Sequence, residues 1–229
     1  PLQKLFHWMN RNTRSGSRRN ISAHYDLSND FFSLFLDPTM AYSAGVFDER
    51  SGGSMEGASR SKFDRVCRSL ELKSSDHLLE IGGGWGGLAM HAAASTGCRV
   101  TTTTISREQH RYMKQAVAEA GLEDQVTVLC DDYRKLNGVY DKIVSIEMIE
   151  AVGHEYFPVF FQRCQQLLKE DGLMLLQAIL IPDQRYARYR KSQDFIQRHI
   201  FPGGCLPSLG ALCEAASSET DLKLIQMED

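Results

Sequence analysis

The sequence contains no long apolar segment. None of its apolar runs approaches the roughly 20 residues that a membrane-spanning helix requires. The first residues also lack the long apolar core of a signal peptide. Because the chain starts at a proline, we expect that residues upstream of it are missing. With 229 residues, of which 42% are hydrophobic, the chain is long enough for one α/β domain with a full core.

Cysteine motifs are absent as well. No two cysteines form a C-x-x-C pair, and none has the His/Cys spacing of a metal site. Scattered cysteines of this kind are typical of free thiols in a cytosolic protein. We therefore expect a cytoplasmic protein without a bound metal. The six cysteines are Cys67, Cys98, Cys130, Cys164, Cys205 and Cys213.

Acidic residues are missing from the first 20 positions, although the whole chain has a net charge of −3. These positions carry a charge of +5, whereas the rest of the chain has 21 basic and 29 acidic residues, a net charge of −8. A basic arm on an acidic body indicates an anionic surface as partner, with a merely solvated leader as the alternative. Residues 2–9 have the apolar spacing of an amphipathic helix, which lies either on a membrane or on its own domain. No ladder of base-stacking aromatics accompanies the arginines, so we expect no nucleic-acid partner.

Glycine, in contrast, is concentrated in one place. Five of the six residues 82–87 are glycine, directly after the apolar run 78–81 and before the helix-forming residues 88–94. This order predicts a strand, a tight loop and a helix, where a ligand can approach the backbone and meet unpaired helix N–H groups. The alternative is a glycine-rich turn that only packs the helix on the strand.

The glycine loop also fits the G-x-G-x-x-G fingerprint of dinucleotide-binding proteins, at Gly82, Gly84 and Gly87. Two features favour S-adenosylmethionine instead. Glu80 directly precedes the loop, where its charge could attract the ammonium group of that ligand through a water or a loop amide. No acid ends the next predicted strand, 100–105, where an NAD site would need one for the ribose. A dinucleotide therefore remains the remote alternative.

Strands and helices alternate regularly along most of the chain. The predicted strands cover 78–81, 99–105, 125–130, 140–147 and 172–179, and the predicted helices cover 59–72, 88–94, 107–120 and 155–168. This alternation predicts a Rossmann-like α/β fold, with a mostly parallel central sheet and helices on both faces. Ligands of such sheets bind at the carboxyl ends of the strands. In this chain those ends carry residues 80–82, 104, 131–133, 147–150 and 177–179.

One further helix is predicted ahead of the sheet. Asp26 or Ser28 could cap it, and Asp37-Pro38 stops it after Leu36. Its apolar residues exceed one helical stripe, so we expect it to be buried in the core or to line an apolar pocket. Residues 52–57 are predicted to form a loop.

The end of the chain leaves the strand–helix rhythm. Residues 181–207, rich in aromatics and arginines, predict an inserted lid helix and a Pro/Gly turn. Such a lid suits a substrate with an anionic head and an apolar tail, although a solvated connector is the alternative. A helix over 209–216 and a strand over 222–227 follow. That strand would leave an open edge, from which we infer that a C-terminal segment is missing.

Several motifs, spread from about residue 20 to the end, resemble the cyclopropane-fatty-acyl-phospholipid synthase family, which includes the mycolic acid cyclopropane synthases. The glycine loop is shared by many methyltransferases, but the last motif is highly specific. The stretch 181–196 is most similar to a plant-like branch of the family. The motifs are His24-Tyr25-Asp26-Leu27, Phe35-Leu36-Asp37-Pro38, Tyr42-Ser43, Glu80 to Gly87, Thr104-Ile105-Ser106 with Gln109, Asp132-Tyr133-Arg134, and Ile200 to Gly204 with Leu206-Pro207-Ser208.

The resemblance implies a class I methyltransferase that uses S-adenosylmethionine to convert a cis double bond of a phospholipid acyl chain into a cyclopropane ring. It implies an N-terminal arm and helical cap at 1–58 and a methyltransferase domain at 59–229 with a lid at 181–207. It places Tyr133 and Arg134 beside the adenine. The full set of expected cofactor residues is Tyr42, Ser43, Glu80, Gly82, Gly84, Trp85, Gly86, Thr104, Ile105, Gln109, Tyr133 and Arg134.

The same resemblance implies a catalytic site. Methylation of an alkene leaves a carbocation, which must be kept from water until a proton is removed and the ring closes. The family is thought to use a bound bicarbonate for this step. Glu150 matches the glutamate of that site and Ile179 its isoleucine, while Ala44 stands where many relatives have cysteine. A salt-bridged carboxylate at a strand end is the alternative interpretation of Glu150.

Two departures put the fate of the carbocation in question. The Glu-His pair of the family is Glu150-Ala151 here, and Gln177 replaces a histidine of the bicarbonate site. A glutamine can donate a hydrogen bond to an anion but cannot shuttle protons near neutral pH. Loss of the proton from a neighbouring carbon would give a methylene- or methyl-branched chain instead of a ring.

Alternatives of other classes remain at this point. The chain could methylate a small amine, or be a membrane-associated accessory protein that binds S-adenosylmethionine without catalysis. Our leading expectation is an enzyme at the inner membrane face, acting on unsaturated phospholipid acyl chains. We allow for a homodimer.

Overall fold

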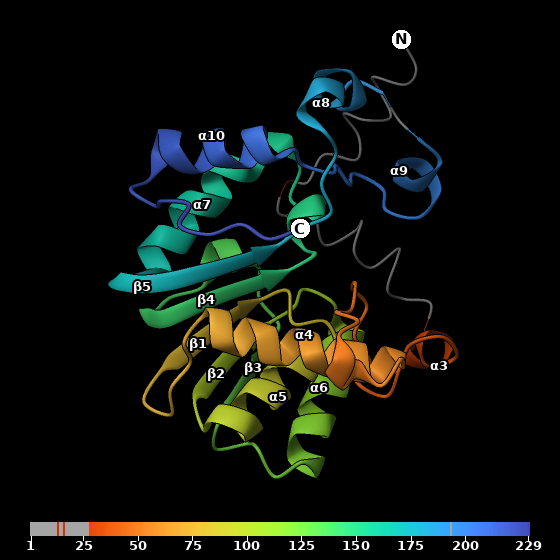
Figure 1. Ribbon diagram of the computed structural model, residues 1–229, viewed down its shortest axis with the longest axis vertical. Coiled ribbons are helices and arrows are strands. Elements are labelled where there is room, and N and C mark those ends of the chain that lie inside the picture. Colours follow the sequence, from red (N-terminus) through yellow and green to blue (C-terminus); the bar gives the residue numbers. More distant parts are fainter. Residues whose placement is uncertain (1–12, 14–15, 17–27, 193) are drawn as a thin grey trace. The chain divides into compact units, whose positions relative to one another are not determined.

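The computed structural model in Figure 1 describes residues 13, 16, 28–192 and 194–229. The chain divides into two compact units. One, the sheet unit, comprises Tyr25–Ile146 and Leu168–Leu176. The other, the lid unit, comprises Pro1–His24, Glu147–Leu167 and Gln177–Asp229. The helix predicted over 2–9 lies outside the described residues.

The sheet unit is built on a five-stranded sheet in the order β3-β2-β1-β4-β5. β1 pairs in parallel with both β2 and β4, and β2 pairs in parallel with β3. In Figure 1, the β5 arrow runs alongside β4 in the same direction. This is the parallel Rossmann-like sheet that the sequence predicts. The strands are β1 (His77–Ile81), β2 (Arg99–Thr103), β3 (Val126–Leu129), β4 (Tyr140–Ile146) and β5 (Leu168–Gln177).

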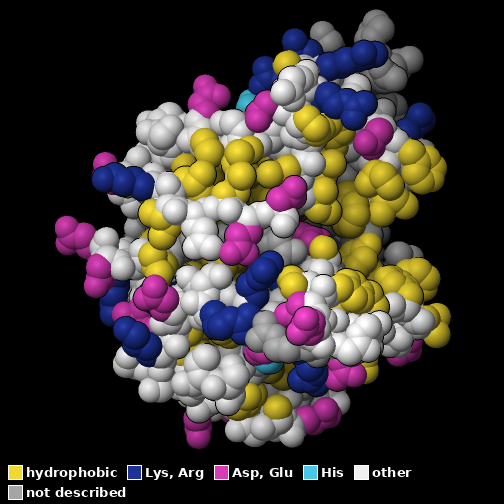
Figure 2. All heavy atoms as spheres, in the orientation of Figure 1, with side chains coloured by type: hydrophobic (Ala, Val, Ile, Leu, Met, Phe, Trp, Pro, Cys, Tyr) yellow, Lys and Arg dark blue, Asp and Glu magenta, His cyan; other side chains and the backbone are white. Residues whose placement is uncertain are grey.

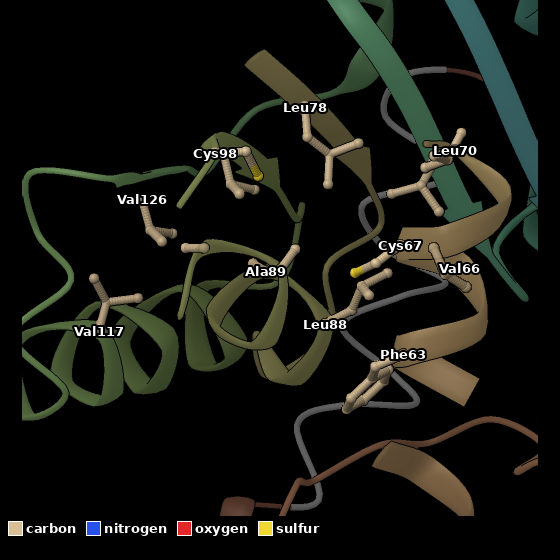
Figure 3. Close-up of a cluster of buried hydrophobic side chains, with 14 residues drawn as sticks. Phe63, Val66, Cys67, Leu70, Leu78, Leu88, Ala89, Cys98, Val117 and Val126 are labelled. Atoms are coloured by element: carbon tan, nitrogen blue, oxygen red, sulfur yellow. The ribbon is translucent and has the colours of Figure 1, made fainter. Parts of the chain in front are cut away.

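Three helices of the sheet unit, α4 (Met55–Ser69), α5 (Gly87–Thr96) and α6 (Arg107–Glu119), follow the predicted alternation. Their apolar faces meet the sheet in one core. Figure 3 shows Phe63 and Val66 of α4, Leu88 and Ala89 of α5 and Leu78 of β1, which belong to one cluster of buried side chains. Leu78 and Ala89 are fully buried, which fixes the glycine loop between a strand and a helix that cannot shift independently.

The helix ahead of the sheet is shorter than predicted. Ser28 caps α3 (Asn29–Ser33), as expected, and Phe32 is buried. Leu34, however, is 83% exposed and Phe35 is 54% exposed, so burial in the core is wrong for these residues, and the lining of an apolar pocket stays a prediction. The helix ends at Ser33, after little more than one turn. The apolar residues 34 and 35 therefore lie beyond the helix and are not buried with Phe32.

The lid unit is mainly helical. It contains α7 (Phe157–Leu167), α8 (Asp183–Tyr189), α9 (Phe195–His199) and α10 (Leu209–Glu219), of which α7 packs on α10. Two short 3₁₀ helices, η3 (Ile149–Ala151) and η4 (His154–Tyr156), precede α7. The lid predicted over 181–207 thus contains two short helices rather than one.

Two other predictions need correction. Residues 222–227 form no strand, because they make no ladder hydrogen bonds, and Ile225 is 78% exposed. The helix predicted from residue 59 begins four residues earlier, at Met55, because the Ser54 hydroxyl caps it by accepting from the Gly57 N–H. Gly57 belongs to this helix, and a Cβ there would lie 1.8 Å from the Ser51 carbonyl oxygen.

Candidate active site

The glycine loop forms an open cradle after β1. Gly82, Gly84 and Gly86 have φ values of 88°, 54° and 91°, in the left-handed region that favours glycine. A Cβ at Gly84 would meet nothing within 4 Å, whereas one at Gly86 would lie 2.5 Å from Cγ of Met113. The backbone at Gly84 therefore faces open space at the amino end of α5. This arrangement fits a ligand that lies against the loop backbone.

Glu80 lies beneath this cradle. It is 3% exposed, and its Oε2 accepts a hydrogen bond of 2.6 Å from the Thr102 hydroxyl. Burial raises the pKa of Glu80 to about 7, while the Thr102 hydrogen bond and the charge of Lys62 act in the opposite direction. A Cβ at Gly83 would lie 1.9 Å from Thr102 Oγ1. Glu80 thus supports the loop from inside, and the predicted attraction of a ligand ammonium stays a prediction.

A buried lysine extends this support to residue 43. Lys62 is 2% exposed, and its Nζ donates a hydrogen bond of 2.5 Å to Oγ of Ser43. The sequence analysis did not single out Lys62. Its signal is present, however, because Lys62 lies in the same helical stripe as the buried Ser59, Phe63 and Val66. A charge in such a stripe needs a buried partner.

The expected residues after β2 form a closed pair. β2 ends at Thr103, and the Thr104 hydroxyl donates a hydrogen bond of 2.7 Å to Oε1 of Gln109. Ser106 caps α6 by accepting from the Gln109 N–H. Ile105 is half-buried beside this pair. The side chains of Thr104 and Gln109 are therefore fixed at the junction between β2 and α6.

Tyr133 and Arg134 lie in η2 (Tyr133–Lys135), after β3. Asp132 caps this helix and also forms an ion pair with Arg134, with Nη2 and Oδ2 2.5 Å apart. Tyr133 is buried, and the guanidinium of Arg134 lies 5.5 Å from the centre of its ring. A flat aromatic and a fixed guanidinium at this strand end suit an adenine ring.

Trp85 and Tyr42 belong to an aromatic cluster around α3. Trp85 is buried, packs on Phe32 with the ring centres 4.8 Å apart, and donates from Nε1 to Oδ1 of Asn29 at 2.8 Å. Tyr42 packs on the other side of the cluster, 5.6 Å from Phe32, and is 37% exposed. Trp85 therefore anchors the glycine loop to α3, a contact with Asn29 that sequence reasoning missed.

The expected catalytic residues Glu150, Gln177 and Ile179 come together in the lid unit. The Ile179 N–H donates a hydrogen bond of 2.6 Å to Oε1 of Glu150. Nε2 of Gln177 donates to Oε1 of Glu147 at 2.8 Å, and the Glu147 N–H donates to the Gln177 carbonyl at 2.8 Å. Glu147 has a φ of 46°, a strained value for a residue other than glycine. Ala44, the fourth expected residue, belongs to the sheet unit and is exposed.

Glu150 is the most perturbed carboxyl group of the lid unit. Within the described part of the chain, its Oε2 is buried and has no hydrogen-bond partner. Burial raises the pKa of Glu150 to about 7, with a smaller contribution in the same direction from Glu147, and the Ile179 N–H opposes this shift. A buried carboxylate oxygen without a partner is costly and is typical of a functional site. Among the described residues, no cation forms an ion pair with Glu150, which does not support its interpretation as a salt-bridged carboxylate.

No three His, Cys, Asp or Glu side chains in the part of the chain that the structure describes gather as a metal site. Among its helices, none combines the length and the apolar character needed to cross a membrane.

The parallel sheet, the glycine cradle and the polar strand ends are those of class I S-adenosylmethionine-dependent methyltransferases. The chain belongs to the mycolic acid cyclopropane synthetase family, whose model matches residues 12–229.

Among curated relatives, tuberculostearic acid methyltransferase UfaA1 of Mycobacterium tuberculosis is 41% identical over 93% of this chain and 51% of its own length. Cyclopropane-fatty-acyl-phospholipid synthase of Escherichia coli is 38% identical over 84% of this chain and 48% of its own. The chain thus spans about half the length of these relatives. The solved structure of mycolic acid cyclopropane synthase CmaA1, complexed with SAH and CTAB, superposes with a TM-score of 0.80 at 37% identity, covering 88% of this chain and 74% of that one.

Proposed function

We propose that this protein transfers the methyl group of S-adenosylmethionine to the cis double bond of an unsaturated phospholipid acyl chain and closes a cyclopropane ring. The observation that carries the proposal is the buried Oε2 of Glu150, which has no partner among the described residues. The names of the relatives support a lipid substrate, and one of them acts on a fatty-acyl phospholipid by its name. The open glycine cradle supports the cofactor.

S-adenosylmethionine, when bound, supplies a methyl group on a sulfonium sulfur. An alkene is a poor nucleophile, so the chain must hold the reacting carbons in line and close together, which can supply several kcal/mol of the barrier. We assign the cofactor to the cradle at Gly82 and Gly84, the Thr104–Gln109 pair, and Tyr133 with Arg134. Formation of the new C–C bond breaks the S–C bond and leaves a positive charge on the second alkene carbon.

We assign the next step to Glu150. In this proposed step its carboxylate stabilises the positive charge, and Oε2 accepts a proton from the added methyl group while the C–H electrons close the ring. With a pKa of about 7, Glu150 is a stronger base than an ordinary carboxylate and is still largely ionised above neutral pH. Its buried position also keeps water away from the cation.

Bicarbonate, which the family resemblance implies, fits this site on one side only. Oε2 of Glu150 could accept from its hydroxyl, and it would then supply the base. Of the donors that would hold its other oxygens, the Ile179 N–H is already used by Glu150, and one of the two N–H groups of Gln177 Nε2 is used by Glu147. The proposed proton transfer therefore does not involve bicarbonate. Equal turnover in bicarbonate-depleted and bicarbonate-supplemented buffer is the expected result.

A branched product is the second candidate. The amide of Gln177 donates to Glu147 and cannot carry a proton, so Gln177 gives Glu150 no help in removing a proton from the added methyl. The 41% identical relative is named as a methyltransferase rather than a ring-forming synthase. Loss of the proton from a neighbouring carbon would give a methylene branch.

The membrane surface is the proposed partner, and the lid unit supplies the argument. Five exposed basic residues and two exposed apolar ones lie along α8 and α9, and Figure 2 shows basic and hydrophobic side chains together over these helices. The two acids of this stretch are used as caps, Asp183 for the Gly210 N–H and Asp194 for the Gln197 N–H. The exposed residues are Arg185, Arg188, Arg190, Lys191, Arg198, Phe195 and Ile196.

The test is mass spectrometry of acyl chains after incubation of the full-length protein with S-adenosylmethionine and vesicles of monounsaturated phospholipid. A gain of one CH2 unit that resists hydrogenation establishes ring closure, and a gain with a reducible double bond establishes a methylene branch. Glu150→Gln should abolish lipid turnover and keep cofactor binding, whereas Glu170→Gln, at an exposed carboxylate, should keep both. Full turnover by Glu150→Gln would refute the assigned role. Turnover of soluble amines alone, or cofactor binding without any product, would favour the amine methyltransferase or the accessory protein.

A further inference from the structure

His154, at the start of η4, joins two elements of the lid unit. Its Nδ1 lies 2.8 Å from the Tyr186 hydroxyl, and its Nε2 lies 2.5 Å from Nη1 of Arg190. Tyr186 and Arg190 are four residues apart, so they project from the same side of α8 and its last turn. The imidazole thus fills the space in front of one face of that helix.

The chemistry of these partners fixes the state of the imidazole. Arginine only donates hydrogen bonds, so Nε2 must accept and His154 must be neutral, with its proton on Nδ1. That proton is donated to the Tyr186 oxygen. Burial raises the pKa of Tyr186, and the nearby thiol of Cys205 contributes in the same direction. A relay of hydrogen bonds therefore runs from Arg190 through His154 to Tyr186, whose hydroxyl lies close to the Cys205 thiol.

Cys205 connects this relay to Glu150. Its backbone N–H donates a hydrogen bond of 2.8 Å to the Glu150 carbonyl oxygen. The neighbouring Gly204 also passes closely, since a Cβ there would lie 3.8 Å from that same carbonyl and 3.0 Å from the Phe201 carbonyl. Residues 204 and 205 therefore pack against the backbone of Glu150. Contacts that fix the position of Cys205 also fix the position of the Glu150 backbone.

We propose that neutral His154 is a positioning residue for Glu150, acting through Tyr186 and Cys205. The inference rests on the proposed function, because Glu150 is its target. Protonation of His154 would remove the acceptor for Arg190 and place two cations in contact, so the relay would open in acid. The charged groups that act on His154 are Arg190 of α8, its neighbour Glu155, and Glu214 of α10. Burial and Arg190 both lower the pKa of His154, which keeps the relay closed near neutral pH.

The experiment compares three variants of the full-length protein in the vesicle assay. His154→Phe keeps a ring but breaks the links to Tyr186 and Arg190. Tyr186→Phe removes the hydroxyl, and with it the links to His154 and to Cys205, but leaves the contact between His154 and Arg190. Each should lower kcat roughly 10- to 100-fold with little change in cofactor affinity. His154→Gln should retain most of the turnover, because an amide can accept from Arg190 and donate to Tyr186. The kcat of His154→Gln should also fall less steeply toward acid pH than that of the wild type, because glutamine cannot be protonated as His154 can. Lys114→Gln, at an exposed position of α6, is the control.

Hydrogen exchange provides a readout that needs no turnover. Peptides that contain Glu150 and Cys205 should exchange faster in His154→Phe and Tyr186→Phe, and in the wild type below pH 6, but not in His154→Gln. Unchanged exchange together with unchanged kcat in both Phe variants would overturn the inference. Faster exchange in a protein whose Glu150→Gln variant is fully active would support the relay and refute the proposed role of Glu150, so the two failures are distinguishable.

Discussion

Nζ of Lys62 donates to Oγ of Ser43 from a position that is 98% shielded from solvent. Lys62→Met keeps the aliphatic stem but removes this bond and the charge that favours ionised Glu80. We expect S-adenosylmethionine to bind about tenfold more weakly, since a hydrogen bond to a charged group contributes about 1.5–3 kcal/mol. Isothermal titration calorimetry measures this change. Arg60→Met, on the exposed side of α4, is the matched control and should bind normally.

The raised pKa of Glu80 predicts a specific pH dependence of stability. The carboxyl binds a proton more tightly in the folded protein than in the unfolded chain, so its contribution to the free energy of unfolding falls as the pH rises from about 4.5 to about 7. Glu80→Gln cannot ionise and should gain stability relative to the wild type across this range, by about 3 kcal/mol at most. Urea unfolding at pH 5, 6, 7 and 8 tests this. A constant difference between the two proteins would contradict it.

Gly84 and Gly86 should respond differently to alanine. Both have positive φ values, which cost an alanine about 1–2 kcal/mol. At Gly86 the new methyl also collides with Met113, so Gly86→Ala should lose a further 1–3 kcal/mol of stability. At Gly84 it enters open space, so Gly84→Ala should lose cofactor affinity out of proportion to its stability. Melting temperature and calorimetric affinity should be measured on both variants. A larger loss of stability in Gly84→Ala than in Gly86→Ala would contradict the prediction.

The basic surface of α8 and α9 predicts salt-sensitive binding to anionic vesicles. Combined Arg185→Gln, Arg188→Gln and Lys191→Gln should weaken binding by about 1 kcal/mol for each charge, and the difference should vanish at high ionic strength. Phe195→Ser should weaken binding at any salt concentration, because that side chain is 68% exposed. Lys114→Gln, on the exposed side of α6, is the control for co-sedimentation. Equal binding of all variants would exclude this surface as the membrane contact.

The periodic parts of the fold could be predicted from sequence, and the reason is local. Strand β1, the glycine turn and α5 each carry their own signal, and the parallel order of the sheet follows from strand–helix alternation. The segment 222–227 has the composition of a strand, but a strand requires a neighbour, which composition cannot supply. The exposure of Leu34 has the same origin, because burial depends on what packs against a helix.

The contacts of the candidate site could be predicted only where both partners belong to the same short motif. The Thr104–Gln109 pair lies within six residues, so its closure could be expected from spacing. The Lys62–Ser43 bond joins residues 19 apart, and His154 meets Tyr186 across 32 positions. No local pattern records such partners. A buried charge or a lone histidine in the sequence signals only that a partner exists, not which one.

The chain passes from the sheet unit to the lid unit after Ile146, returns at Leu168 and leaves again after Leu176. All expected cofactor residues belong to the first unit, and Glu150 with Gln177 and Ile179 to the second. In evolutionary terms the architecture is modular, because the residues that we assign to the methyl donor and those that we assign to proton removal belong to different units, so that one set can change while the other is kept.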